Sequence, residues 1–178
     1  MNFSIRATIR ALAAPNCRLS CRQSIWRTGL AELHRRGQGE RESGAFLLGT
    51  RRNGTATIKR FVFYDDLDPG CLHTGIVRFS SAGYPPLWDI CRREGLMVVA
   101  DVHTHEFEAC QSSLDRTNPM IAIAGHVAII VPWYAQSPVQ KSKLGIYRYL
   151  GQHDWVSILD EAAERYLHLG MWGGWTLW

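Results

Sequence analysis

Two histidines separated by one residue, His103 and His105, are the residues best placed to do chemistry in this sequence. They end an apolar stretch that begins at Leu96, as expected of a strand. Side chains alternate between the two faces of a strand, so both imidazoles and the carboxylate of Asp101 point the same way. Same-face Cα atoms lie roughly 6.6 Å apart, so two imidazoles can lean onto one ion at about 2.0 Å each. This spacing favours zinc.

The third ligand of such a zinc ion has three candidates. Two histidines and one carboxylate leave the fourth tetrahedral position to water, which is the catalytic pattern. The segment Ser112-Ser113-Leu114-Asp115 offers a carboxylate after a loop, and Asp115 is our first choice. Asp101 ranks second, because it suits the role of orienting an imidazole. Cys110 ranks third, since its loop would have to fold back to reach the metal.

Two neighbouring groups also have structural explanations. Ser112 or Ser113 suits the N-cap of a helical turn, which is compatible with a site at the same place. His126 begins an apolar stretch and fits a hydrogen-bonded core histidine better than a metal ligand.

The helices that must support this site follow from periodicity and capping residues. Ser20 and Gln23 have capping-box spacing, and the apolar residues after them predict a helix over 21–36. Pro85 opens a second helix that ends at Gly95. A last helix is expected over residues 158–169.

The strands are indicated by β-branched and aromatic runs. The Asn53-Gly54 turn predicts a hairpin of strands 45–50 and 55–64. Further strands are expected over residues 76–80, 96–105, 126–131 and 143–150, the last two central in a sheet. Helices and strands interleave without regular βαβ alternation, so we predict an α+β fold, loosely α/β, with a mixed sheet and packed helices.

The composition limits the class of protein. With 178 residues, 46% of them hydrophobic, one domain can bury its own core. A net charge of +4 without a dense basic run gives no indication of nucleic-acid binding. No apolar run approaches the ~18 residues of a membrane span. Five cysteines without Cys-x-x-Cys spacing fit reduced thiols in the cytoplasm.

The chain is expected to divide into three segments. Residues 1–20 form an N-terminal strand or a mobile segment, and residues 21–169 form the main domain. Residues 170–178 form a tail with three tryptophans and three glycines, which either packs on the body or presents an aromatic patch.

The order of four sequence elements resembles the JAMM (JAB1/MPN/Mov34) metalloprotease family. These elements are Glu42, the apolar run from Gly44 to Gly49, His103-Thr104-His105 and Ser112-x-x-Asp115, and the resemblance extends from about residue 41 to residue 132. It implies a single MPN or JAB-like domain, in which helices flank a central mixed sheet with cytidine-deaminase-like layering.

Carried over position by position, the resemblance also implies individual roles. His103, His105 and Asp115 would be the Zn²⁺ ligands. Glu42 would be the general base on the bound water, and Ser112 would stabilise the oxyanion.

The function implied by the resemblance is a zinc isopeptidase or peptidase. It would cleave after the C-terminal glycine of a ubiquitin-like protein, in deconjugation or precursor processing, and small bacterial members have E1-like and E2-like proteins as partners. Two alternatives stay open: a catalytically silent MPN-type scaffold, and an enzyme acting on a sulfur-carrier protein or a small amide. Glu106 replaces a proline common in the family, and six residues rather than seven separate His105 from Ser112, which bears on the substrate more than on the metal.

Overall fold

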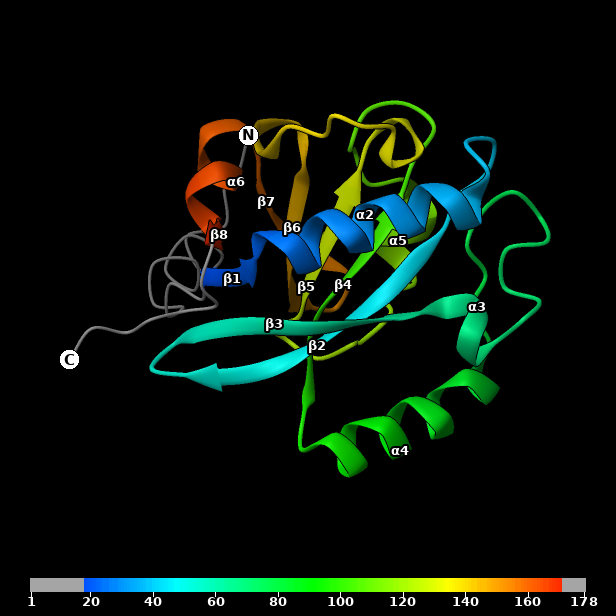
Figure 1. The fold of residues 1–178 in the computed structure, drawn as a ribbon, viewed down its shortest axis with the longest axis horizontal. Coiled ribbons are helices and arrows are strands. Elements are labelled where there is room, and N and C mark those ends of the chain that lie inside the picture. The colour runs from blue at the N-terminus through cyan, green and yellow to red at the C-terminus, as the bar shows by residue number, and fades with distance from the viewer. Residues whose placement is uncertain (1–17, 171–178) are drawn as a thin grey trace.

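The computed structural model describes residues 18–170, which combine strands and helices in irregular order (Figure 1). The strands are β1 (Arg18–Arg22), β2 (Gly44–Arg52), β3 (Thr55–Phe63), β4 (Met97–Thr104), β5 (Val127–Val131), β6 (Gly145–Gly151), β7 (Asp154–Ile158) and β8 (Leu167–Gly170). The helices are α2 (Gln23–Gly37), α3 (Tyr64–Leu67), α4 (Tyr84–Glu94), α5 (Ser113–Thr117) and α6 (Asp160–Tyr166), with 3-10 turns η1 (Ser81–Gly83), η2 (Trp133–Ala135) and η3 (Lys141–Lys143). The predicted α+β class is confirmed.

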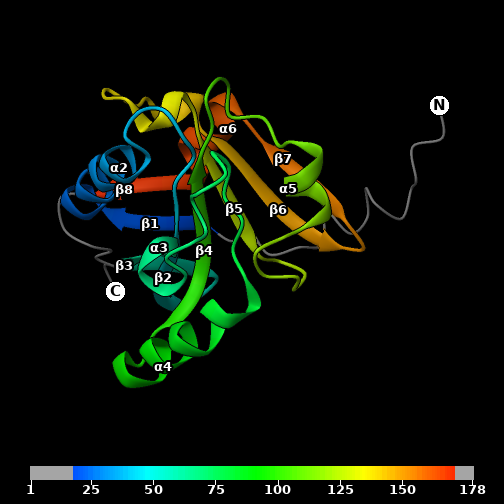
Figure 2. The same ribbon diagram turned by 90° about the vertical axis from the view of Figure 1, so that its right-hand side faces the viewer.

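All eight strands belong to one mixed, curled sheet with the order β7-β6-β5-β4-β2-β3-β1-β8 (Figure 2). β2 is antiparallel to both β3 and β4, whereas β4 and β5 are parallel. The predicted central position of β5 and β6 is confirmed, because β6 has β7 as its outer neighbour. The parallel pair places the carboxyl ends of β4 and β5 at the same edge of the sheet.

The two larger hydrophobic cores lie on opposite faces of this sheet. Leu33 of α2 and Leu47 of β2 belong to one core, together with residues of α6. Phe46 and Leu48 of β2 belong to the other, together with Leu87 of α4. α2 and α4 accordingly lie on opposite sides of the β2–β3 hairpin (Figure 1). The first six residues of β2 are buried on both faces, which explains why this part of its sequence is a continuous apolar run.

The start of α2 differs from the predicted capping box. Its N-cap is Arg22, and no side chain caps this helix end. Ser20 instead lies in β1, where its hydroxyl donates to the hydroxyl of Thr57 at 3.0 Å. The strand before the helix therefore uses the serine that the spacing had assigned to the cap.

One further predicted strand is wrong, and the predicted last helix is confirmed only in its middle part. Residues 76–80 form an extended loop, without strand pairing. The last helix, α6, is confined to Asp160–Tyr166, because the residues expected at its two ends belong to β7 and β8.

The predicted terminal segments lie largely outside the described residues. β1 includes the end of the segment 1–20, and Gly170, assigned to the tail, belongs to β8. Residues 1–17 and 171–178 are not described. Within residues 18–170, no helix is both long and apolar enough to cross a membrane. The four cysteines in this range, three buried and one exposed, have free thiols.

Candidate metal centre

β4 carries the two histidines to the edge of the sheet. His103 lies within β4 and is buried, and His105 directly follows the last strand residue, Thr104. The amide of His105 donates to the carbonyl oxygen of Val131 in β5 at 2.9 Å. Both histidines therefore lie where two parallel strands end, which is where open sheets with parallel strands bind ligands.

The residue between the histidines points to the opposite face, as the alternation predicts. The hydroxyl of Thr104 accepts a hydrogen bond from the amide of Ser43 at 2.9 Å. The hydroxyl of Ser43 in turn donates to the carbonyl oxygen of Leu33 in α2 at 2.7 Å. This chain of contacts joins α2, the start of β2 and the end of β4, and so fixes the backbone next to Glu42.

The third ligand candidate, Asp115, is presented by the short helix α5. Ser112 is the N-cap of α5, and its hydroxyl accepts from the amide of Asp115 at 3.2 Å. The carboxylate of Asp115 accepts from the amide and the hydroxyl of Ser112, at 2.7 and 2.8 Å. This reciprocal capping box aims the carboxylate, so the predicted cap and the predicted ligand occupy the same turn.

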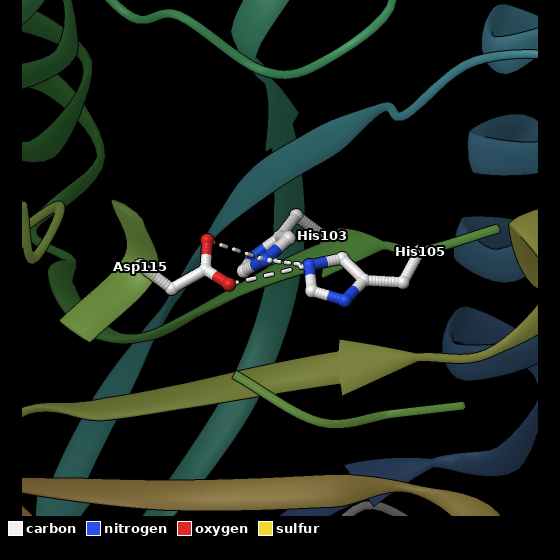
Figure 3. A group of neighbouring side chains, drawn as sticks. All are labelled: His103, His105 and Asp115. Atoms are coloured by element: carbon white, nitrogen blue, oxygen red, sulfur yellow. Dashed lines mark hydrogen bonds and ion pairs between the residues drawn. The ribbon is translucent and has the colours of Figure 1, made fainter. Parts of the chain in front are cut away.

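The three side chains converge on a common point (Figure 3). The Nε2 atoms of His103 and His105 are 3.1 Å apart, and each lies 3.3 Å from an oxygen of Asp115. A tetrahedral ion with ligands at about 2.0–2.1 Å has ligand atoms about 3.3–3.4 Å apart. The observed separations are close to this edge length, so the group can hold a metal ion.

Hydrogen bonds among the three side chains do not use all of their donor and acceptor capacity. Only one of two facing Nε2 atoms can donate to the other, and both face the same carboxylate. The Nδ1 atom of His103 is buried and has no hydrogen-bond partner, so this ring is contacted through Nε2. One metal ion would satisfy the two nitrogen lone pairs and the carboxylate together.

The charge states of these groups are coupled. Burial raises the pKa of Asp115, but hydrogen bonds from His103, His105 and Ser112 outweigh it and hold this pKa well below its usual range. Burial lowers the pKa of His103, yet its hydrogen bond to Asp115 and the surrounding negative charge raise it overall. The carboxylate is thus ionised at neutral pH, and the site has the negative potential that attracts a cation.

Glu42 lies beside the three donors. Its Oε1 atom is 3.7 Å from Nε2 of His105, while Oε2 accepts a hydrogen bond from the amide of Val77 at 2.9 Å. The amide of Glu42 donates to the carbonyl oxygen of Gly75 at 2.9 Å. The segment wrongly predicted as a strand therefore holds one carboxylate oxygen and leaves the other facing the histidines.

Residues far along the chain anchor the loop between His105 and α5. The hydroxyl of Tyr147 in β6 donates to the carbonyl oxygen of Ala109 at 2.7 Å and accepts from the amide of Gln111 at 3.3 Å. The indole of Trp155 donates to the carbonyl oxygen of Arg116 at 3.1 Å. Sequence reasoning missed these contacts, because a single tyrosine or tryptophan in a strand gives no signal of its partner.

The other ligand candidates have different surroundings. Asp101 is on the predicted face, but it orients His126 rather than a ligand histidine: its Oδ1 lies 2.5 Å from Nε2 of His126. Its Oδ2 accepts from the hydroxyl of Tyr64 at 3.3 Å. His126 is the buried, hydrogen-bonded histidine that was predicted. Cys110 is exposed and does not belong to the three-donor group.

Comparisons with known proteins bear on the fold. No protein-family model matches the sequence. The solution structure of protein DSY2949 from Desulfitobacterium hafniense, a Northeast Structural Genomics Consortium target, is similar with a TM-score of 0.60 and 14% sequence identity, over 85% of this chain and 92% of that chain. At this identity the likeness shows a shared fold.

Proposed function

We propose that the chain is a zinc-dependent peptidase with an MPN (JAMM-type) domain, which cleaves after the C-terminal glycine of a ubiquitin-like protein. The observation that carries the proposal is the meeting of His103, His105 and Asp115 with the carboxylate of Glu42, which comes from a distant part of the sequence. A cluster of two histidines and one aspartate with a purely structural role would not require a second carboxylate beside it. Glu42 provides one, and its Oε1 atom faces His105.

The three donors suit zinc in type and number. Imidazole and carboxylate are ligands that zinc accepts, and three protein ligands leave one coordination position open. When bound, zinc supplies Lewis acidity and lowers the pKa of a coordinated water toward about 7.

Glu42 is the proposed general base. Its Oε2 atom is held by the amide of Val77, so Oε1 is the oxygen that accepts the proton of the attacking water. The same oxygen then returns this proton to the leaving amine as the peptide bond breaks. A rigidly held carboxylate performs both transfers without losing its position.

Ser112 has a double role in this proposal. Its hydroxyl donates to Asp115, which holds the ligand carboxylate. To stabilise the oxyanion of the tetrahedral intermediate, the same hydroxyl must exchange this partner for the substrate oxygen. Its contribution to the rate is therefore smaller than that of Glu42.

The proposed substrate is an extended, glycine-terminated tail. Such a tail binds by main-chain hydrogen bonds to an exposed strand, and glycine fits where a side chain would collide. E1-like and E2-like proteins that load and transfer the ubiquitin-like protein are the proposed partners. The exposed side chain of Phe107, two residues after His105, provides an apolar contact beside the proposed cleavage position.

A ubiquitin-like protein fused through its terminal glycine to a reporter tests this function. We expect the zinc-loaded chain to cleave after the glycine, and Glu42→Gln to lower kcat by about 10²–10⁴-fold while keeping its zinc. Glu40→Gln, an exposed glutamate two residues away, is the matched control and should retain the parent rate. Equal rates for Glu42→Gln and the parent would exclude Glu42 as base; a zinc-loaded parent that cleaves no fusion would favour the silent scaffold.

A further inference from the structure

The rings of the two ligand histidines have little support from hydrogen bonds. A histidine that binds a metal ion almost always donates its second ring N–H to a neighbouring acceptor, which fixes the orientation of the ring. The Nδ1 atom of His103 is buried and has no such partner. Among the residues that the structure describes, the polar contacts of the His105 ring are all made through Nε2. The backbone is therefore the main support of these ligands.

Both backbone groups of His105 are bonded to the end of β5 and the turn after it. Its amide donates to the carbonyl oxygen of Val131 at 2.9 Å, and its carbonyl oxygen accepts from the amide of Tyr134 at 2.8 Å. The amide of Trp133 also donates to the carbonyl oxygen of Phe107 at 3.1 Å. The position of His105 thus depends on the conformation of η2.

The backbone of η2 is strained. Trp133, Tyr134 and Ala135 have φ values of 51°, 50° and 58°, which place three consecutive residues other than glycine in the left-handed region. Such residues rarely adopt this conformation, and it persists where surrounding contacts enforce it. Ala135 makes one of these contacts, because its side chain is buried in the core that includes Leu33 of α2.

A second contact comes from His34 in the last turn of α2. Its Nδ1 atom lies 2.9 Å from the carbonyl oxygen of Tyr134, which follows 100 positions later in the sequence. Because a carbonyl oxygen only accepts, Nδ1 is the donor. In the part of the chain that the structure describes, no backbone amide donates to the same oxygen. His34 therefore binds the carbonyl group at the centre of the strained turn.

Helix α2 itself does not require this histidine. A basic residue in the last turn of a helix commonly offsets the negative end of the helix dipole. Arg35 and Arg36 also lie in this turn and place positive charge there. The ring of His34 is half-buried and is bonded to η2. Its hydrogen bond consequently serves the turn after β5 rather than the end of α2.

The preceding residue of α2 contacts the other side of the site. The carbonyl oxygen of Leu33 accepts from the hydroxyl of Ser43, which directly follows Glu42. Adjacent residues of one helix thus support the proposed base and the ligand His105, whose polar atoms lie 3.7 Å apart.

We propose that His34 is a positioning residue of the metal centre. It holds η2 in the strained conformation, and η2 holds the backbone of His105, so that Nε2 of this ligand stays directed at the ion. The inference rests on the metal binding that is part of the proposed function, and it does not depend on the identity of the substrate.

Two substitutions at this one position test the role of the donor. His34→Leu removes the hydrogen bond, whereas His34→Asn keeps an N–H donor close to the position of Nδ1. We expect His34→Leu to weaken zinc binding by about 10–100-fold and His34→Asn to stay within about threefold of the parent. A competitive zinc titration of the folded proteins measures these affinities.

Hydrogen–deuterium exchange of the Tyr134 amide provides a second readout, which needs no zinc. In metal-free protein, His34→Leu should speed this exchange at least about tenfold and leave the β2–β3 hairpin unchanged, because only η2 loses a contact. His34→Asn should restore the slow exchange. Arg35→Leu is the matched control, since Arg35 is exposed and contacts Glu32. It should change neither the zinc affinity nor the exchange.

Two results would overturn the proposal directly. One is a His34→Leu variant with the zinc affinity and the Tyr134 exchange of the parent. The other is an equal loss in His34→Leu and His34→Asn, because the hydrogen bond would then not be the cause. A parent that binds no zinc would overturn the metal centre and with it this role of His34; faster exchange in His34→Leu would then show that the histidine holds η2 alone.

Discussion

Two clusters of histidine and aspartate include side chains from the same face of β4. They differ in the distances between their polar atoms and in the exposure of their side chains. In the pair of His126 and Asp101, the two atoms are 2.5 Å apart, and both side chains are at most 4% exposed. In the three-donor group of His103, His105 and Asp115, the separations are 3.1–3.3 Å, and the side chains are 7–19% exposed. The first cluster has the distance of a short hydrogen bond, and the second has the edge length of a metal tetrahedron.

The comparison shows that residue type alone does not identify a site. One carboxylate oxygen of Asp101 contacts His126 and the other accepts from Tyr64, so this aspartate supports a single histidine. Asp115 is held by Ser112 but also faces two imidazoles, and Glu42 lies next to them. We therefore expect the first cluster to govern folding and the second to govern metal binding.

The largest expected difference is in stability without metal. Asp101→Ala leaves His126 buried without its partner and should lower the free energy of unfolding by roughly 3–5 kcal/mol. Asp115→Ala should lower it by only about 1–2 kcal/mol, through loss of the capping box and of the contacts with the two partly exposed imidazoles. Urea denaturation in the presence of a chelator measures both values. Equal losses of stability would contradict the different roles assigned to the two clusters.

With zinc, the contribution of the three-donor group to stability should become similar to that of the pair of His126 and Asp101. At a free concentration 100 times its dissociation constant, zinc should raise the free energy of unfolding of the parent by about 2.7 kcal/mol. His103→Ala should abolish this gain. Thermal denaturation with and without zinc provides the measurement, and a zinc-dependent shift that persists in His103→Ala would argue against the assigned ligands.

The smallest effects are expected from two tyrosines that each support one cluster. Tyr64→Phe and Tyr147→Phe should each cost about 0.5–1.5 kcal/mol of stability, because each removes hydrogen bonds made by one hydroxyl. Only Tyr147→Phe should also weaken zinc binding, by about tenfold, since Tyr147 anchors the loop that leads to Asp115. A competitive zinc titration of both variants distinguishes them; equal affinities would show that the anchor does not position the ligand.

Much of the fold follows from local sequence. Helix α2, the β2–β3 hairpin, α4 and the strands β4, β5 and β6 were all predictable, because their periodicity and turn residues agree with their packing. β8 was not, because its strand conformation depends on pairing with β1, nearly 150 residues earlier in the sequence. Ser20 has the spacing of a capping residue, but its hydroxyl donates to the hydroxyl of Thr57 in a neighbouring strand.

The candidate site was predictable to a similar degree. The alternation of β4 places His103 and Thr104 on opposite faces, and the capping box of α5 coincides with Asp115. The anchor of Glu42 was not predictable, since it is the backbone amide of Val77 and any residue type except proline provides one. Tertiary contacts of this kind leave no mark in the sequence.

The most direct test of the account is the metal content of purified protein. After expression with zinc and dialysis, we expect about one zinc per chain. His103→Ala should lose it, and His126→Gln, a substitution in the neighbouring cluster, should keep it as long as the chain is folded. A parent without zinc, or a folded His126→Gln that loses zinc while His103→Ala retains it, would contradict the assignment of His103, His105 and Asp115 as the metal centre.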